Sequence, residues 1–215
     1  MIINFSVQNF GSIRDKQILS FEADNSKHLE DYYIIPINGL RLLKLGLIYG
    51  ANASGKTTIL QALDFLKKIV LHPKEKKTYV FDFKPFLFDS ATPKQNTILS
   101  IEFIQNSVRY YYEVELNEKA IINEKLDFYN SQKANVYKRT TNLETQFTEI
   151  TFGSKIKTDK IFEKTLESNT LWNNTVLGGF LKTNIEIQEL KEATDWFENY
   201  FGPFIRSDID NSQLK

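Results

Sequence analysis

Gly50-Ala51-Asn52-Ala53-Ser54-Gly55-Lys56-Thr57 is the stretch from which the fold of this chain can be predicted. It matches the phosphate-binding pattern G-x-x-x-x-G-K-[ST] and lies between an apolar run and an amphipathic segment, which is the context that the pattern requires. The two glycines let the backbone turn tightly, so that successive N–H groups can converge on a phosphate. The helix that follows adds its own free N–H groups and the positive end of its dipole.

The side chains of this loop predict a nucleoside triphosphate ligand. Lys56 would reach the β- and γ-phosphates, and the Thr57 hydroxyl would coordinate Mg²⁺. The predicted cofactors are therefore ATP and Mg²⁺, and the predicted binding residues are Gly50, Ala51, Asn52, Ala53, Ser54, Gly55, Lys56, Thr57 and Thr58. The alternative is a glycine turn before a helix that carries Lys-Thr by chance.

The segments beside the loop predict a strand and a helix. Residues 42–49 form a short run rich in Leu and Ile, typical of a strand buried on both faces. Residues 56–71 repeat apolar side chains mostly at spacings of three and four, which predicts an amphipathic helix. His72-Pro73 ends that helix, because the residue before a proline is disfavoured in the helical region.

The remaining segments predict an antiparallel sheet followed by helices. Ile3, Phe5 and Val7 alternate with polar residues, and residues 17–21 would complete a hairpin. Residues 79–152 keep a period of two and predict an antiparallel meander. Helices are expected after residue 154: one over 171–181, and one that begins at a Thr183-x-x-Glu186 capping box and ends at Gly202-Pro203.

These elements predict an α/β fold of the P-loop NTPase kind; the family resemblance described below implies that it is similar to ABC ATPases and that its last helices form an arm. It would contain a partial sheet, an antiparallel β subdomain and a C-terminal helical arm. The expected sections are residues 1–72 with the hairpin and the Walker A strand, loop and helix, residues 73–153 with the β subdomain, and residues 154–215 with an incomplete helical arm.

Composition excludes several classes of function. The 215 residues carry 27 Lys and Arg against 27 Asp and Glu, so the formal net charge is zero and no overall charge favours DNA or anionic lipid. The absence of cysteine excludes disulfides and thiolate metal sites and suits a reducing cytoplasm. No segment approaches the roughly 18 apolar residues of a membrane span. We expect a soluble, cytoplasmic protein without a membrane partner.

The sequence resembles a known group of ATPases. Gly50-x-Asn52-x-Ser54-Gly55-Lys56-Thr57-Thr58, with Asn9-Phe10-Gly11-Ser12-Ile13 near the start, resembles the ABC-clan ATPases related to SMC and RecF. It is more similar to the bacterial AAA-type ATPases known as RloA-like or abortive-infection proteins. Looser similarities to their β subdomain are Lys84-Pro85-Phe86, Glu124-Lys125-Leu126 and Tyr137-Lys138-Arg139. The resemblance implies a role in bacterial anti-phage defence and a second ATPase subunit as partner in a homodimer.

The sequence departs from that group in its catalytic parts. ABC-clan enzymes hydrolyse ATP with a Walker B strand that ends in Asp-Glu, a signature loop donated across a dimer and a switch histidine. No Asp-Glu pair follows an apolar run here. The nearest stretch, residues 98–102, is explained by an alternating strand with an outward glutamate. Leu177-Gly178-Gly179 resembles a signature loop only in its glycines and is explained by a flexible helix junction.

The resemblance places the missing parts after the helical arm. The chain is therefore expected to be the N-terminal portion of a longer ATPase, whether truncated, split or degenerate. Without the acidic pair, magnesium lacks a ligand and the attacking water lacks its base. We identify no catalytic residue and expect ATPase activity only after completion by a C-terminal half or an effector partner and dimerisation.

Three further features carry candidate residues. Glu124 shares a face with apolar neighbours and needs a partner, for which Arg139 is a candidate; the pair would be structural, or would sense nucleotide or a second subunit. Tyr110-Tyr111-Tyr112 would pack on both faces of a strand or stack on bases. The lysines at 67, 68, 74, 76 and 77 form a solvated face or a basic patch.

The sequence suggests three alternative functions. The first is the ATP-binding portion of an ABC-clan ATPase. The second is an interaction module gated by nucleotide that never hydrolyses it. The third, a P-loop kinase or GTPase, fits less well because the β insert is long and no Asn-Lys-x-Asp string is present. A nucleic-acid partner stays open as an alternative, but the sequence gives it no direct support.

Overall fold

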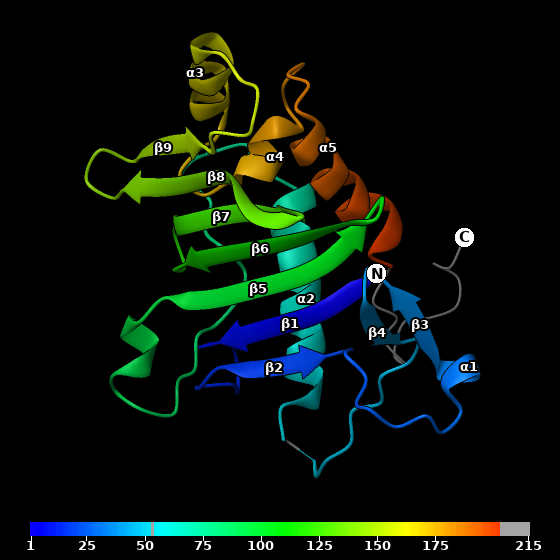
Figure 1. Ribbon diagram of the computed structural model, residues 1–215. Coiled ribbons are helices and arrows are strands. Elements are labelled where there is room, and N and C mark those ends of the chain that lie inside the picture. The colour runs from blue at the N-terminus through cyan, green and yellow to red at the C-terminus, as the bar shows by residue number, and fades with distance from the viewer. Residues whose placement is uncertain (53, 203–215) are drawn as a thin grey trace, which may run out of the picture.

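The computed structural model describes residues 1–52 and 54–202, and its main element is a seven-stranded sheet (Figure 1). The strand order is β2-β1-β5-β6-β7-β8-β9, and every neighbouring pair is antiparallel. Its strands are β1 (Ile2–Gln8), β2 (Gln17–Ser20), β5 (Thr97–Gln105), β6 (Val108–Leu116), β7 (Ile121–Asn130), β8 (Gln132–Asn142) and β9 (Phe147–Phe152). The N-terminal hairpin thus belongs to the same sheet as the later meander.

Helices accompany this sheet, and a small two-stranded unit lies at its edge. The helices are α2 (Lys56–Leu71), α3 (Lys160–Asn169), α4 (Val176–Phe180) and α5 (Gln188–Asp195), with a π-helical turn at Trp196–Tyr200 and a 3₁₀ turn at Thr92–Lys94. The small unit consists of α1 (Glu30–Tyr33), β3 (Ile34–Ile37) and β4 (Leu40–Leu43). Figure 1 shows α2 crossing behind the strands. None of the described helices combines the length and the hydropathy needed to cross a membrane.

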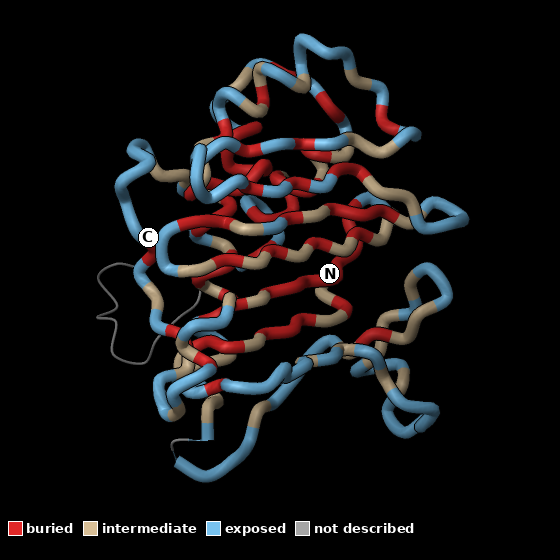
Figure 2. The backbone as a smooth tube through the Cα atoms, turned by 90° about the vertical axis from the view of Figure 1, so that its left-hand side faces the viewer, coloured by how far each residue is buried: buried red, intermediate tan, exposed pale blue. Residues whose placement is uncertain are grey.

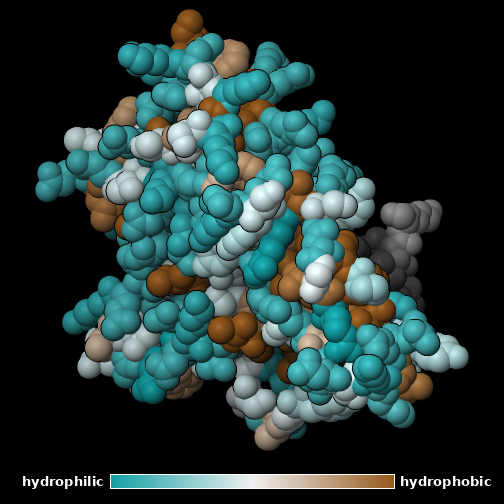
Figure 3. Space-filling model, in the orientation of Figure 1, coloured by the Kyte–Doolittle hydropathy of each residue, from teal (hydrophilic) through white to brown (hydrophobic). Residues whose placement is uncertain are grey.

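The sheet has one buried and one open face because its strands alternate. On β6, Tyr110, Tyr112 and Val114 are buried against the helices, and Tyr111 points to the other face. Trp196 stacks on Phe103 at a centroid distance of 4.0 Å. Figure 2 shows buried residues along the strands, and the face away from α2 is largely hydrophilic in Figure 3. The core thus lies between the sheet and α2, α4 and α5.

Several sequence predictions are confirmed. Helix α2 spans Lys56–Leu71, as predicted, and its C-cap is His72. The hairpin of β1 with β2 and the hairpin of β5 with β6 have the expected antiparallel pairing. The fold is a mixed α/β structure with a mostly antiparallel sheet.

The predicted strand over residues 42–49 is wrong. β4 ends at Leu43 and pairs with β3 outside the main sheet, and residues 45–50 have no regular secondary structure. The side chains of Leu45, Leu47 and Tyr49 are 57%, 65% and 83% exposed. The apolar run indicates a tendency toward burial, but no described segment provides a neighbouring strand to bury it.

Two helix predictions at the C-terminal end are also wrong. The helix expected over 171–181 is only the five-residue α4, because residues 172–175 are used in polar contacts with other segments. The Thr183 capping box does not form. Thr183 Oγ1 donates to Phe180 O instead, and α5 begins later, with Ile187 as its N-cap. Of the expected helix end, Pro203 lies outside the described residues.

Candidate functional site

The candidate phosphate-binding loop connects an exposed segment to the N-terminus of α2. Gly55 is the N-cap residue, and its φ of 89° lies in the left-handed region that favours glycine. Among the residues that the structure describes, no side chain makes a cap hydrogen bond to the first turn of α2. The helix therefore presents amide groups and the positive end of its dipole at this loop, which favours an anion.

Lys56 lies over the loop that precedes it. Its Nζ donates to the carbonyl oxygens of Gly50 at 2.8 Å and Ala51 at 2.6 Å. A Cβ placed on Gly50 would be only 2.7 Å from Ser54 Oγ, so a larger residue at this position would force the Ser54 hydroxyl to move. The ammonium group is thus held against the first two residues of the loop. Of the nine predicted binding residues, Ala53 lies outside the described part of the chain.

The two threonines that open α2 have different surroundings. Thr57 is exposed, and no hydrogen bond of its side chain is seen among the described residues. Thr58 Oγ1 is 2.8 Å from Ser12 Oγ, which comes from the turn between β1 and β2. Sequence reasoning missed this contact as part of the site, although Asn9-Phe10-Gly11-Ser12 stood out as a motif.

The residues at this loop fit ATP better than an independent metal. An ammonium group, free helix amides and a hydroxyl suit a polyphosphate and its magnesium ion. Among the described residues, no group of three or more His, Asp or Glu could hold a metal ion. A magnesium ion would therefore depend on Thr57 and on the phosphates themselves.

A cavity of ≈ 500 Å³ lies along the side of α2, and the described residues of the loop do not line it. Its apolar wall includes Phe10 and Phe83, whose rings stack at a centroid distance of 5.6 Å. Gly11 and Gln61 also contribute to its lining. The phosphate-binding candidate is thus a feature of the surface loop, where recognition would rest on amides and charge rather than on a deep cavity.

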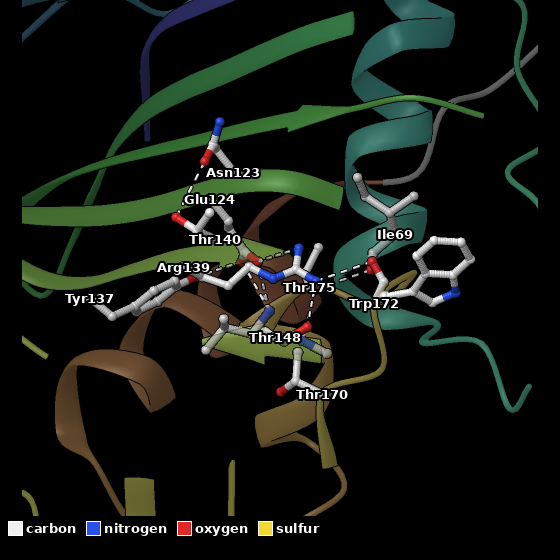
Figure 4. A network of polar contacts seen from close by, with 12 residues as sticks. Ile69, Asn123, Glu124, Tyr137, Arg139, Thr140, Thr148, Thr170, Trp172 and Thr175 are labelled. Atoms are coloured by element: carbon white, nitrogen blue, oxygen red, sulfur yellow. Dashed lines mark hydrogen bonds and ion pairs between the residues drawn. The ribbon is translucent and has the colours of Figure 1, made fainter. Parts of the chain in front are cut away.

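Glu124 and Arg139 form the buried pair that the sequence predicted. They face each other in the register of β7 and β8, and their side chains are fully buried (Figure 4). Glu124 Oε1 accepts from Tyr137 Oη at 2.6 Å and Tyr112 Oη at 2.9 Å, and its Oε2 accepts from the Val176 amide at 2.8 Å. Burial raises the pKa of the Glu124 carboxyl, and these groups oppose that shift.

Arg139 is less completely paired than Glu124. Its Nη1 is 4.0 Å from Glu124 Oε2, and Nη2 donates to Thr148 Oγ1 and to Trp172 O, both at 3.1 Å. Among the described residues, Nε and Nη1 have no hydrogen-bond partner. Thr175, beside this network, donates to Ile69 O near the C-terminal end of α2. The pair therefore lies away from the loop at the other end of α2 and joins β7 and β8 to the C-terminal helices.

The other candidate features are structural. Glu102, at the end of the stretch that resembled a Walker B strand, lies on β5 and pairs with Arg109. Gly178 and Gly179 lie inside α4, and a Cβ on Gly179 would be 2.2 Å from Thr170 Oγ1, so close packing explains that glycine. This contact replaces the flexible junction that the sequence suggested.

Three of the five lysines after the loop contact other groups. Lys68 pairs with Asp64, and Lys67 donates to Phe201 O. Lys76 lies over the Tyr79 ring. On the sheet, Tyr111 contacts Lys125 and Lys133, each 5.3–5.4 Å from its ring centroid, and both lysines have carboxylate partners. These contacts favour packing over base stacking.

A left-handed glycine followed by a lysine at the start of an amphipathic helix is typical of the P-loop class of nucleotide-binding proteins. Comparison with protein families supports this class. The family described as "AAA domain, putative AbiEii toxin, Type IV TA system" matches residues 47–201, which is more than half of the chain. The chain belongs to this AAA-domain family and is a nucleotide-binding, ATPase-like protein of the abortive-infection kind. No curated protein matches it.

Proposed function

We propose that this chain is the ATP-binding portion of an ABC-clan ATPase. The nucleotide would bind residues 50–58, with Lys56 on the β- and γ-phosphates and Thr57 on Mg²⁺. The observation that carries the proposal is the uncapped N-terminus of α2, which follows a left-handed Gly55 and lies beside the Lys56 ammonium. Bound magnesium would neutralise charge on the phosphates, and the loop amides would orient them.

Hydrolysis would need an acidic pair from another polypeptide segment. The sequence has no apolar run that ends in Asp-Glu. Residues 45–49 support such a completion, because they are strand-like in sequence, enter the loop directly and expose Leu45, Leu47 and Tyr49. An added strand would pair with their backbone and bury these side chains. We keep residues 1–72, 73–153 and 154–215 as the proposed sections of this ATPase.

The biological setting and the assembly are part of the same proposal. The matched family is described by a putative toxin of a Type IV toxin–antitoxin system. We propose an abortive-infection role in bacterial anti-phage defence, in the cytoplasm, with a homodimer or a C-terminal half completing the ATPase site. The alternative is a non-hydrolysing, nucleotide-gated interaction module, which the missing acidic pair also supports.

Calorimetry with Lys56→Ala and a matched Lys68→Ala variant tests ATP binding. Lys68 lies on the same helix, and its side chain is 62% exposed. We expect Mg²⁺-assisted ATP binding by the unaltered chain and by Lys68→Ala, and loss of binding in Lys56→Ala. Equal ATP affinity of all three proteins would contradict the proposal.

Turnover separates the two functions. If the chain is an incomplete ATPase, its steady-state ATP hydrolysis should begin only when a folded segment with an Asp-Glu strand is added. Continued absence of hydrolysis with that partner would favour the switch. Sustained hydrolysis by the chain alone that Lys56→Ala abolishes would show that catalytic acids are present within these 215 residues.

A further inference from the structure

Asn9 is a buried polar residue that is not part of the proposed ATP-binding site. It follows β1, is 0% exposed and has a φ of 54°. Its Nδ2 donates to Thr92 O at 2.9 Å and Gln95 O at 2.8 Å, and its Oδ1 accepts from the Phe86 amide at 2.9 Å. One side chain thus fixes two separate parts of the segment between α2 and β5.

The main chain of Asn9 begins the turn that leads into β2. Its N–H donates to Arg14 O at 3.1 Å, and its carbonyl accepts from Thr97 Oγ1 at 2.6 Å. Within the turn, the amides and carbonyls of Phe10 and Ile13 bond to each other at 2.9 Å in both directions. The turn is therefore rigid, and Asn9 connects it to the surrounding loop.

The tip of this turn lies against the start of α2. Ser12 Oγ is 2.8 Å from Thr58 Oγ1, and a Cβ on Gly11 would be 2.8 Å from Thr58 Cγ2. A Cβ on Gly55 would in turn be 3.3 Å from Ser12 Oγ. The phosphate-binding end of α2 thus rests directly on the tip of the turn.

We propose that Asn9 is a positioning residue for the nucleotide site, acting through the Gly11-Ser12 tip on Gly55 and Thr58. This inference rests on the proposed ATP site. Asparagine suits the position for two reasons: it tolerates the left-handed conformation, and its amide provides both the donors and the acceptor that the surrounding carbonyls and amide require. Aspartate would keep the acceptor but turn a charged oxygen toward two carbonyl oxygens.

The test compares Asn9→Asp with Asn173→Asp. Asn173 is also buried, at 1% exposed, and its Nδ2 also donates to two carbonyls, those of Lys76 and Tyr79. It belongs to the segment that packs against the C-terminal end of α2. Thermal unfolding measures how much each variant destabilises the fold. Calorimetry with ATP and Mg²⁺, carried out well below the melting temperature, measures how much each variant changes the ATP affinity.

We expect both variants to melt at lower temperature, and only Asn9→Asp to weaken ATP binding, by about tenfold. Equal affinities in the two folded variants would overturn the proposal. Ser12→Ala provides a second test, because Ser12 is exposed and its loss should not prevent folding. It should weaken ATP binding as well, and its effect should not add fully to that of Asn9→Asp.

If Asn9→Asp does not fold, the Ser12→Ala variant tests the proposal by itself. Weaker ATP binding by Ser12→Ala would show that the turn supports the nucleotide site, and unchanged ATP binding would overturn the proposal. Lys56→Ala distinguishes failure of the proposed ATP site from failure of the positioning role of Asn9. If Lys56→Ala binds ATP normally, the proposed function fails. If Lys56→Ala loses binding while Asn9→Asp and Ser12→Ala keep it, only the positioning role of Asn9 fails.

Discussion

Replacing Glu124 by Gln should destabilise the fold strongly, although the two side chains have nearly the same size. The Glu124 and Arg139 side chains are both 0% exposed, so the substitution leaves a buried guanidinium without its negative partner. Breaking a buried pair in this way costs about 3–5 kcal/mol. The Gln amide also provides donors where the Val176 amide already donates, which adds about 1 kcal/mol.

This loss is large compared with the whole stability of a domain, which is about 5–15 kcal/mol. Urea unfolding followed by tryptophan fluorescence measures it, because Trp172 and Trp196 both lie in the C-terminal segment that the pair helps to hold. Glu113→Gln is the matched control. Glu113 pairs with Lys125 on the open face of the sheet, and that loss should stay below about 1 kcal/mol.

A second substitution, at Arg139, distinguishes the cost of the unpaired buried charge from the cost of altered packing. Glu124→Gln combined with Arg139→Met removes both buried charges, so most of the lost stability should return. A free energy of unfolding for Glu124→Gln within about 1 kcal/mol of the original would refute the reasoning. So would a double variant that is less stable than Glu124→Gln alone, because the damage would then come from packing.

Three further predictions concern packing, ionisation and exposure. Gly179→Ala should lower the free energy of unfolding by about 1–3 kcal/mol, because its Cβ would be 2.2 Å from Thr170 Oγ1. Gly39→Ala is the contrasting variant: its Cβ has no atom within 4 Å, but Gly39 has a positive φ that Gly179 lacks, so it shows what backbone strain costs without a steric clash. Burial raises the pKa of Tyr112 and of Tyr137, so the folded state holds their protons more tightly than the unfolded chain and stability should fall as the pH rises above 10. Absorbance titration should show these two phenols ionising only on unfolding, and their ionisation in the native state would contradict their burial. Leu47→Lys should change the unfolding free energy by less than about 0.5 kcal/mol, because Leu47 is 65% exposed, whereas a loss of about 2–5 kcal/mol would show that the segment is buried.

Local sequence patterns correctly predicted the elements whose ends are set by residues close to them in the sequence. The limits of α2 follow from its apolar spacing and from His72-Pro73, and both act within a few residues. Alternation also placed Glu124 on the apolar side of its strand, and its need for a partner suggested Arg139 on the next strand, which is its neighbour in the register. Their other partners could not be predicted in this way. Val176 is 52 residues from Glu124 in sequence, and its contact depends on how α4 packs on the sheet.

The same limit explains the errors. The sequence of residues 42–49 indicates that these side chains favour burial, but it does not name the segment that would cover them. The Thr183 capping box satisfies a local rule, yet Thr183 Oγ1 bonds to the end of α4 instead. In both places the decisive partner lies outside the window of residues from which the prediction was made.

The contacts of α2 differ between its two ends, and this difference bears on function. Near the C-terminal end, Asn174 bonds to both the N–H and the carbonyl of Lys74, and Thr175 bonds to Ile69 O. At the N-terminal end, the side-chain hydrogen bond from another segment that the structure describes is the exposed pair of Ser12 with Thr58. Stability is thus concentrated away from the loop, and regions with few buried contacts open at low free energy. A nucleotide bound at this end would use part of its binding energy to order the described residues there, and the turn that Asn9 fixes is the element that would reduce this cost.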